Sequence, residues 1–517
     1  MFCFRFFVGF VAFCFFQFHD IATDRLKIQW GYFAYATNCW GMICPPSSII
    51  ERALKGLNAL PYKELDYESY QNLGIVTISL LLSLIINKLF SKNKIVLHPF
   101  LKIMLWAALP IFIYATSLMF MFFDKEWIEE KIFLITMFKA SARFMWSVYF
   151  ILSIVAVFVL NYWYCHIKNK KIAFIILGLC IVFSGAEMNN YFKEKFFQQK
   201  GYDNMLSKNE LDKFKIENAI PNIENYQAML LLPKVALWND NFITDLNWDV
   251  HHFGFRFALA NQMPLISAML SRFSVGEMTE AIELLANPLI EKSLPKKFPN
   301  NKNILLLVAK NVDSFSSSER FLISQGEKII SREKFDIYSL ALNKINTNSF
   351  QNEAKLNAEK YFAAGNEALL NYHFDETKTN INYFGGGAKL FPKGKNKVFD
   401  TLINVEDNTL VQLSAWRHFD SHRYGSGEWF LEQSQDGKNY TEIYIGDTRY
   451  SNDIHDDWIR FEKSFYVSGK TYLRLHFTNV QTTWLDEICL KKEAQLLIYK
   501  NETTTNSFLY NNFKVKK

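Results

Sequence analysis

The 517-residue chain lacks the patterns that mark several common protein classes. Its seven cysteines form no disulfide framework and no zinc-type spacing; only Cys39 and Cys44 could pair, if their loop lies outside the cytoplasm. The chain has neither a Gly-x-Gly-x-x-Gly nor a P-loop pattern, which argues against nucleotide binding. The net charge of +6 forms no basic stripe with interleaved aromatics, which argues against nucleic acid as a partner. No Ser-His-Asp, Gly-x-Ser-x-Gly or Cys-His arrangement with supporting context indicates a hydrolase.

Hydrophobic runs, by contrast, are abundant in the first third of a chain that is 50% hydrophobic and contains 49 phenylalanines. Such runs lie at about 1–18, 74–90, 100–123, 142–164 and 172–190. About 20 apolar residues can cross a bilayer as a helix. The first run lacks a small-residue cleavage site, so we interpret it as a span rather than a signal peptide. The sequence therefore predicts an α-helical membrane bundle of about five spans over residues 1–192.

Lysines orient these spans. Segment 88–102 and turn 166–171 each carry several lysines and no acidic residue, so both are expected in the cytoplasm. The N-terminus is then cytoplasmic, whereas loop 19–73 and everything after about residue 190 are extracytoplasmic. Segment 124–141 is expected to lie on the outer surface as an amphipathic helix. We therefore expect a multi-pass protein of the bacterial cytoplasmic (inner) membrane with a large extracytoplasmic C-terminal region.

The remaining two-thirds of the chain divide into two predicted domains. Apolar strand-like runs alternate with helix-like runs between residues 193 and 371, which predicts an α/β domain. The expected strands are Gln227–Leu232, Ile304–Ala309 and Asp336–Leu342, and the expected helices are Ser207–Asn218, Val275–Leu289, Ser316–Gln325 and Gln351–Phe362.

Short alternating runs separated by turns predict a β-sandwich over 372–492, followed by a tail, 493–517, with one further strand. Asp436-Gly437 between two alternating runs is a strong hairpin signal. The segment W-F-L-E-Q-S-Q-D-G-K-N-Y at 429–440, with W-L-D-E-I at 484–488, resembles the galactose-binding-like jelly rolls of many carbohydrate-binding modules. The resemblance implies a jelly-roll fold.

A loop of this sandwich combines the residue types of a sugar site, where an aromatic ring stacks on the sugar and polar groups bind its hydroxyls. It is the stretch W-R-H-F-D-S-H-R-Y-G-S-G, which we expect to be exposed. The candidate carbohydrate-binding residues are Trp416, His418, Asp420, His422, Arg423 and Tyr424. The alternative is that the tryptophans belong to the sandwich core, as we expect for Trp429 and Trp484.

Arg143, at the outer end of the fourth predicted span, follows Lys139. A cation in this position either anchors the span at the headgroups or binds an anion, and arginine suits a phosphate. Both residues are therefore candidates to bind a lipid-linked phosphate.

The segment K-A-S-A-R-F-M-W-S-V-Y-F from Lys139, with its flanking spans and loop, resembles membrane proteins of the GT-C glycosyltransferase superfamily over roughly 19–190. The resemblance implies transfer of a sugar from a polyprenyl-phosphate carrier on the extracytoplasmic side, during envelope glycan assembly. Such enzymes place a catalytic carboxylate in the first extracytoplasmic loop of a larger bundle. Asp20 follows the first span and is the candidate general base, or else a solvated loop residue. The small number of spans predicts that the chain is the C-terminal part of a longer protein or an inactive remnant.

Two other clusters have weaker patterns. Glu64, Asp66 and Glu68 could hold a divalent cation, although a solvated acidic loop is the simpler interpretation, and no cofactor is evident. His251 and His252 lack further metal ligands at a defined spacing, so we expect loop histidines or a small-molecule contact.

These predictions lead to two alternative hypotheses for the function. The first is a membrane glycosyltransferase, and the second is a non-enzymatic, membrane-anchored protein for glycan binding or envelope assembly. A transport subunit is disfavoured because the spans are nearly devoid of polar residues at mid-membrane depth. The expected partners are membrane lipids, a polyprenyl-phosphate-linked sugar and an envelope glycan.

Overall fold

The computed structural model describes most of the chain. The described residues are 24, 35–45, 48–59, 71–118, 127–128, 131, 138, 140–193, 207–215, 223–235, 241–243, 248–268, 274–310, 312, 315–345, 348–361, 367–406, 408–420, 423, 425–500 and 506–517. They form two compact units, a helical unit within Lys27–Asp203 and a second unit that comprises Asn204–Lys517 with the N-terminal residues to Leu26.

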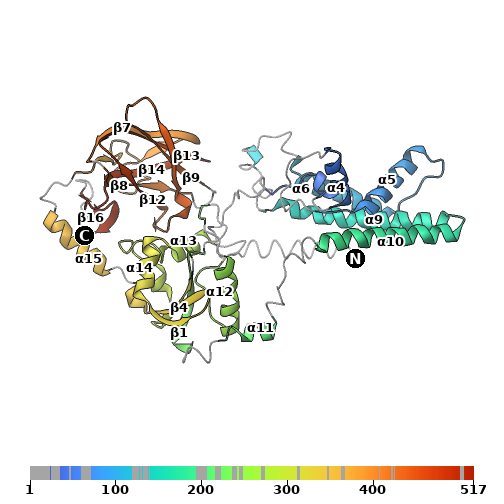
Figure 1. Cartoon of the computed structure of the whole chain (residues 1–517), viewed down its shortest axis with the longest axis horizontal. Helices are drawn as coiled ribbons and strands as arrows, with labels where there is room; N and C mark the ends of the chain where they lie inside the picture. Colours follow the sequence, from blue (N-terminus) through green and yellow to red (C-terminus); the bar gives the residue numbers. More distant parts are fainter. Residues whose placement is uncertain are drawn as a thin grey trace. The chain divides into compact units, whose positions relative to one another are not determined.

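In its described residues, the helical unit contains four apolar helices and two short helices (Figure 1). The apolar helices are α5 (Ile75–Phe90), α6 (Pro99–Ala115), α9 (Met145–His166) and α10 (Lys170–Phe192), and the short ones are α3 (Trp40–Ile43) and α4 (Ile49–Gly56). Ser141–His166 and Lys170–Asn189 are long and apolar enough to cross a membrane, whereas α5 and α6 are shorter. The predicted first span and most of the predicted surface helix 124–141 lie outside the described residues.

Hydrogen bonds bring several helix ends together. Glu187, near the end of α10, accepts a hydrogen bond from the backbone N–H of Ile75 at the start of α5 (3.0 Å). Just before α5, the Gln71 side chain donates to the carbonyl oxygen of Ala142, in the turn that precedes α9 (3.4 Å). The starts of α5 and α9 therefore lie at the same end of the helical unit as the end of α10.

The second unit begins with a mixed four-stranded sheet, β1-β2-β4-β3, in which only the β1–β2 pair is parallel. Its strands are β1 (Tyr226–Leu232), β2 (Asn303–Ala309), β3 (Glu327–Ser331) and β4 (Phe335–Leu340), and its helices are α11 (Lys208–Asp212), α12 (Trp248–Asn261), α13 (Val275–Glu283), α14 (Ser317–Gln325) and α15 (Asn348–Tyr361). Apolar residues of α12 pack on one face of the sheet, and those of α14 and the turn after α13 pack on the other. The mixed sheet with its helices agrees with the predicted α/β layers, but α12 and β3 were not predicted, and α11 and α13 are shorter than the predicted helices.

His251 and His252 lie on helix α12, so their assignment to a loop was wrong. The apolar positions around them, Val250 and Phe257, are core residues of the sheet–helix layer. Burial lowers the pKa of His251, and the charge of His252 lowers it further.

The chain then folds into a sandwich of a four-stranded sheet, β10-β9-β13-β7, and a six-stranded sheet, β11-β12-β8-β14-β5 with β6 on β14. The strands are β5 (Leu370–Tyr372), β6 (Lys389–Phe391), β7 (Gly394–Asn404), β8 (Thr409–His418), β9 (Gly427–Ser434), β10 (Thr441–Asp447), β11 (Ile454–His455), β12 (Trp458–Val467), β13 (Lys470–Asn479) and β14 (Thr483–Lys492). Side chains that alternate along the strands, such as Trp429, Leu431 and Phe477, fill the space between the sheets. Trp429 is therefore a core residue, as predicted.

The predicted Asp436-Gly437 hairpin joins β9 to β10. Asp436 accepts hydrogen bonds from the backbone N–H groups of Lys438 and Asn439, both at 2.8 Å. These bonds hold the pKa of the Asp436 carboxyl well below its usual value. The turn is consequently stabilised by its own side chain.

The segment that we expected to be a tail forms a three-stranded sheet of β15 (Ile498–Tyr499), β16 (Ser507–Tyr510) and β17 (Phe513–Lys516). Asn512, in the turn between β16 and β17, donates hydrogen bonds to the Ser414 hydroxyl (2.9 Å) and the Glu487 carbonyl (2.7 Å). These contacts hold the small sheet against the six-stranded sheet.

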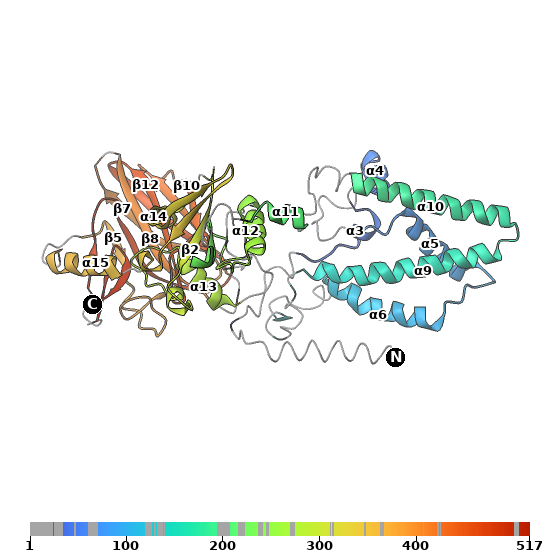
Figure 2. The ribbon, with the colours of Figure 1, turned by 90° about the horizontal axis from the view of Figure 1, so that it is seen from below.

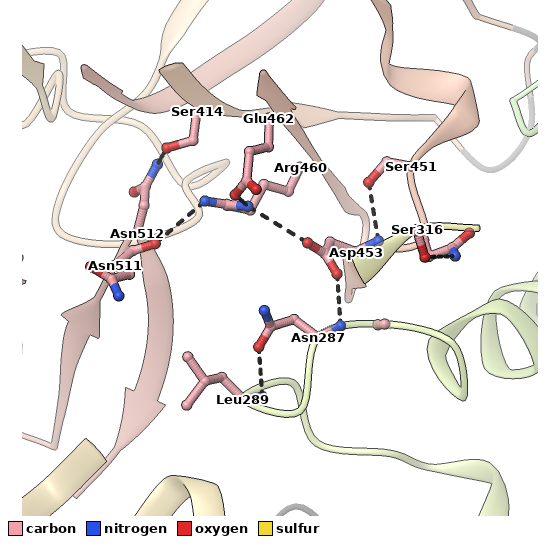
Figure 3. A network of polar contacts seen from close by, with 12 residues as sticks. Asn287, Leu289, Ser316, Ser414, Ser451, Asp453, Arg460, Glu462, Asn511 and Asn512 are labelled. Carbon is pink, nitrogen blue, oxygen red and sulfur yellow. Dashed lines mark hydrogen bonds and ion pairs between the residues drawn. The ribbon is translucent and has the colours of Figure 1, made fainter. Parts of the chain in front are cut away.

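A polar network joins the α/β layers to the sandwich (Figure 3). Asp453 accepts a hydrogen bond from the backbone N–H of Asn287, which follows α13 (2.7 Å), and its other oxygen lies 3.6 Å from Nη1 of Arg460. Arg460 also pairs with Glu462 and donates to the Asn511 carbonyl oxygen (3.4 Å). Apolar residues of α13 pack alongside against Phe419, Ile454 and Ile459.

Candidate functional site

The predicted sugar-binding loop is partly a buried strand, so the expectation that its tryptophan is exposed was wrong. Trp416 lies in β8 at the centre of the six-stranded sheet and is fully buried. Its ring stacks on Tyr383 with centroids 3.9 Å apart, and its Nε1 donates to the carbonyl oxygen of Asn512 (2.7 Å). This side chain is a core residue because the C-terminal sheet covers it.

The rest of the predicted set lies at or beyond the end of β8. His418 is half-buried, and burial lowers its pKa despite the opposing charges of Asp457 and Asp420. The carbonyl oxygens of Asp420 and Arg423 both accept hydrogen bonds from the Asn241 side chain, at 3.2 and 2.8 Å. His422 and Tyr424 lie outside the described residues.

The predicted membrane site is described only at Arg143. This residue is exposed in the 3-10 turn Ser141–Phe144 that leads into α9. Lys139, Asp20 and the carboxylates Glu64, Asp66 and Glu68 lie outside the described residues. Among the residues that the structure does describe, no group of three or more His, Cys, Asp or Glu side chains could hold a metal ion.

The outer face of the four-stranded sheet carries an arrangement that we had not assigned to a site. Because side chains alternate along a strand, Phe430 points away from the core that its neighbours Trp429 and Leu431 occupy. The strand pairing places Phe430 between Tyr444 of β10 and His476 of β13. The Phe430 and Tyr444 rings meet edge to face at 5.4 Å, and Tyr444 is 54% exposed.

The next row on this face is charged. Nε of Arg474 donates to Asp400 (2.8 Å) and its Nη1 donates to Glu432 (3.0 Å). Its guanidinium lies 4.0 Å from the centre of the Tyr440 ring. Glu432 also lies 3.2 Å from Nε2 of His476. These contacts orient the guanidinium of Arg474 and the carboxylates of Asp400 and Glu432 relative to one another.

One ion pair crosses the face. Lys395 of the outer strand β7 pairs with Glu442 of the opposite outer strand β10. The Lys395 ammonium lies 5.7 Å from the centre of the Phe430 ring. Both partners are nearly half exposed, and such pairs contribute about 0–1 kcal/mol. A ligand that stacks on Phe430 could therefore displace this pair at little cost.

The face thus combines aromatic rings with oriented donors and acceptors. Ring faces bind the C–H surface of a sugar, and charged groups hydrogen-bond its hydroxyls. Burial and the nearby carboxylates of Asp447 and Glu428 raise the pKa of Tyr444, so its phenol remains protonated and can donate. The chemistry is that of recognising a neutral, hydroxyl-rich molecule.

The sequence predicted alternating runs at β9, β10 and β13, but it predicted neither β7 nor the site. The signal was the alternation itself: if Trp429 is a core residue, Phe430 must point outward, and the same holds for Arg474 and His476 around the buried Leu475. The pairing of β9 with β13 brings these residues together, although their strands are not consecutive.

Comparison with known proteins gives two kinds of similarity. Residues 1–184 match a family described as "Domain of unknown function (DUF6311)". The chain matches no curated protein.

Several solved structures are similar to the C-terminal region. One is the CBM22-1 xylan-binding domain of Paenibacillus barcinonensis Xyn10C, with 13% identity over 25% of this chain and 97% of that one and a TM-score of 0.20. Another is a carbohydrate-binding module of Cellvibrio mixtus lichenase 5A in complex with cellotriose, with 15% identity over 24% of this chain and 98% of that one and a TM-score of 0.17.

Proposed function

We propose that this protein is a membrane-anchored carbohydrate-binding protein, with its sugar site on the outer face of the four-stranded sheet. The observation that carries the proposal is the pair of adjacent rows on this face, one with Tyr444, Phe430 and His476, the other centred on Arg474. The jelly-roll resemblance of the sequence agrees with it. An envelope glycan outside the cytoplasm is the expected ligand.

Membrane anchoring rests on the helical unit. The long apolar helices α9 and α10 support it, and the shared end of α5, α9 and α10 agrees with a multi-pass bundle. With the lysine-rich turns in the cytoplasm, the chain beyond α10 would be extracytoplasmic.

A polyprenyl-phosphate-dependent transferase is the second candidate. Arg143 favours it, because an exposed guanidinium in the turn before α9 is placed to meet a lipid phosphate. In that case Lys139 would bind the same phosphate and Asp20 would act as general base. A DUF6311 match alone names no activity.

The binding proposal is tested with the full chain, purified in a detergent without a sugar headgroup so that the micelle offers no competing ligand. A glycan array identifies the ligand, and titration calorimetry then compares Phe430→Ala with Tyr466→Ala. Tyr466 is a matched control, because it is 61% exposed but lies on β12 of the other sheet.

We expect Phe430→Ala to weaken binding by at least about tenfold, which is about 1.4 kcal/mol, and Tyr466→Ala to leave it unchanged. A wild-type protein that binds no glycan would contradict the proposal. Equal losses in both variants would place the site elsewhere.

A further inference from the structure

A pocket of about 510 Å³ lies beside the β10 edge of the sandwich, where the α/β layers meet it. Small-molecule pockets commonly hold about 300–1,000 Å³. The pocket is lined by Ile243 and by five segments, which are Pro233–Lys234 after β1, Ser316–Glu319 at the start of α14, Tyr444–Asp447 of β10, Tyr450–Asp453, and Arg460–Lys463 of β12.

The α/β wall of this pocket lies where such sheets usually bind ligands. Strands β1 and β2 are parallel; Lys234 follows the carboxyl end of β1, and α14 follows β2. Ligands of open α/β sheets bind outside the carboxyl ends of the strands. The wall is also rigid, because Glu319 accepts hydrogen bonds from the backbone N–H groups of Lys234 (2.7 Å) and Ser316 (2.8 Å).

Two buried residues of the lining each have a polar atom without a partner in the described part of the chain. Asn452 is 7% exposed and donates its Nδ2 to the Ser316 hydroxyl (3.1 Å), but its Oδ1 accepts nothing there. Arg460 is 2% exposed, and its Nε donates to nothing among the same residues. An unmet acceptor and an unmet donor are costly when buried, and a hydroxyl can satisfy either of them.

The charges of the lining disfavour an anion. The ammonium of Lys234 donates to the carbonyl oxygens of Tyr450 and Ser451, both at 3.0 Å. Arg460 pairs with Asp453 and Glu462, as Figure 3 shows. The lining cations Lys234, Arg460 and Lys463 are outnumbered by the carboxyl groups of Glu319, Asp447, Asp453 and Glu462. Such a field does not attract a phosphate, whereas it suits an uncharged ligand.

The pocket also has ring surfaces. Tyr444 and Tyr450 are 54% and 48% exposed and belong to its lining. Tyr444 is also the outermost aromatic residue of the row formed with Phe430 on the sheet face. The pocket and the glycan-binding face therefore share a residue.

From this we infer that the pocket is a second carbohydrate subsite, which takes one or two uncharged sugar residues at the β10 edge of the face. For the class of ligand, this inference rests on the proposed function. Its own support is the pocket, the unmet polar atoms of Asn452 and Arg460, and the position at the carboxyl ends of β1 and β2. A longer glycan would place its terminal residues in the pocket. A free monosaccharide would bind in the pocket and not on the sheet face.

The test blocks the pocket without changing its buried network. Ser317 is exposed at the first position of α14, so Ser317→Trp places a large ring at the pocket wall. The matched control is Arg320→Trp, which puts the same ring on an exposed position of α14 outside the lining. The probes are free glucose, galactose, mannose, xylose and N-acetylglucosamine, and the best glycan of the array. Binding to the full chain is followed by saturation-transfer NMR and calorimetry in the same sugar-free detergent.

We expect Ser317→Trp to abolish monosaccharide binding and to raise the Kd of the glycan at least about fivefold, whereas Arg320→Trp changes neither. Phe430→Ala should weaken the glycan but retain the monosaccharide. If Ser317→Trp binds both probes as the wild type does while Phe430→Ala loses the glycan, the pocket subsite is refuted and the proposed function stands. If the wild type binds neither probe, both are refuted.

Discussion

The helical unit and the sandwich have opposite polarity. In the helical unit, large apolar side chains are exposed, among them Trp106 at 74% and Phe174 at 69%, while Thr37 and Gln71 are buried and joined by a 2.9 Å hydrogen bond. In the sandwich, Trp429 and Phe477 are fully buried, and the outer face carries Arg474 with its carboxylate partners.

The difference bears on the medium that the surface of each unit favours. An extended apolar surface is rare on a soluble monomer, and polar groups prefer a bundle interior when the surroundings are lipid. Charged rows on a sheet, by contrast, require water or a polar ligand. The contrast therefore supports the proposed membrane anchoring of the helical unit.

The sandwich side of this contrast is tested by the adjacent residues Trp429 and Phe430, which lie on opposite faces of β9. Trp429→Ala should lower the free energy of unfolding by about 3–5 kcal/mol, because it opens a cavity between the sheets. Phe430→Ala should cost about 1 kcal/mol or less and act mainly on glycan binding. Thermal unfolding monitored by fluorescence measures both, and similar losses would show that the two residues are not on different faces.

A second pair of variants compares the exposed surfaces of the two units. Ile181 on α10 is 64% exposed and Tyr466 on β12 is 61% exposed. If lipid surrounds α10, Ile181→Arg should cost about 2.5–3.5 kcal/mol and reduce the membrane-inserted fraction. Tyr466→Arg should change stability by no more than about 0.5 kcal/mol. Membrane fractionation with glycosylation mapping checks this; unimpaired insertion of Ile181→Arg would contradict the assignment of α10 as a span.

Lys292 differs from the charged residues on the outer face of the sandwich, because this lysine of the second unit is buried. Burial lowers its pKa to about 7, against the opposing effect of Asp453 and Glu283, and its ammonium donates to the carbonyl oxygens of Ala286 (2.7 Å) and Asn287 (3.1 Å). The unfolded lysine titrates near about 10.4, so between these pH values the unfolded chain binds more protons and stability rises with pH.

Between pH 7 and pH 9, the wild type should therefore gain on the order of 2 kcal/mol relative to Lys292→Met. The comparison cancels the titrating groups that Lys292 does not influence, whereas Asp453 and Glu283 interact with it. Thermal midpoints at the two pH values measure the gain, and equal slopes would mean that Lys292 stays charged in the folded state.

A variant of Arg143 tests whether this residue of the helical unit binds a lipid-linked phosphate. If it binds a lipid-linked phosphate, Arg143→Ala should weaken polyprenyl-phosphate binding about tenfold, or about 1.4 kcal/mol, and leave binding of the uncharged polyprenol unchanged. Lys168→Ala, in the turn between α9 and α10, is the control. Native mass spectrometry of the detergent-solubilised protein distinguishes the cases, and equal affinities would retire the transferase candidate.

Local patterns predicted much of the fold. The apolar strands β1, β2 and β4 and the Asp436 turn follow from short stretches of sequence, because apolar runs and the contacts of a turn are local. The C-terminal sheet was underestimated, because its strands are short and Asn512 holds it to residues far away in sequence.

The sugar site was the less predictable part. Trp416, in a glycine-flanked polar stretch, looked exposed, yet Tyr383 and Asn512 cover it from 33 or more residues away in sequence. The face around Phe430 needed the order of strands in the sheet, since β9 lies between β10 and β13.

The sequence by itself determined which segments are apolar helices and which are alternating strands, because hydrophobic periodicity is a property of neighbouring residues. In the alternating strands β9 and β13, it also determined which side is apolar. Only the tertiary structure decided which polar sides meet, because strand pairing and the covering of one sheet by the C-terminal strands depend on contacts between distant residues. The location of the proposed sugar site and its neighbouring pocket are consequences of that pairing.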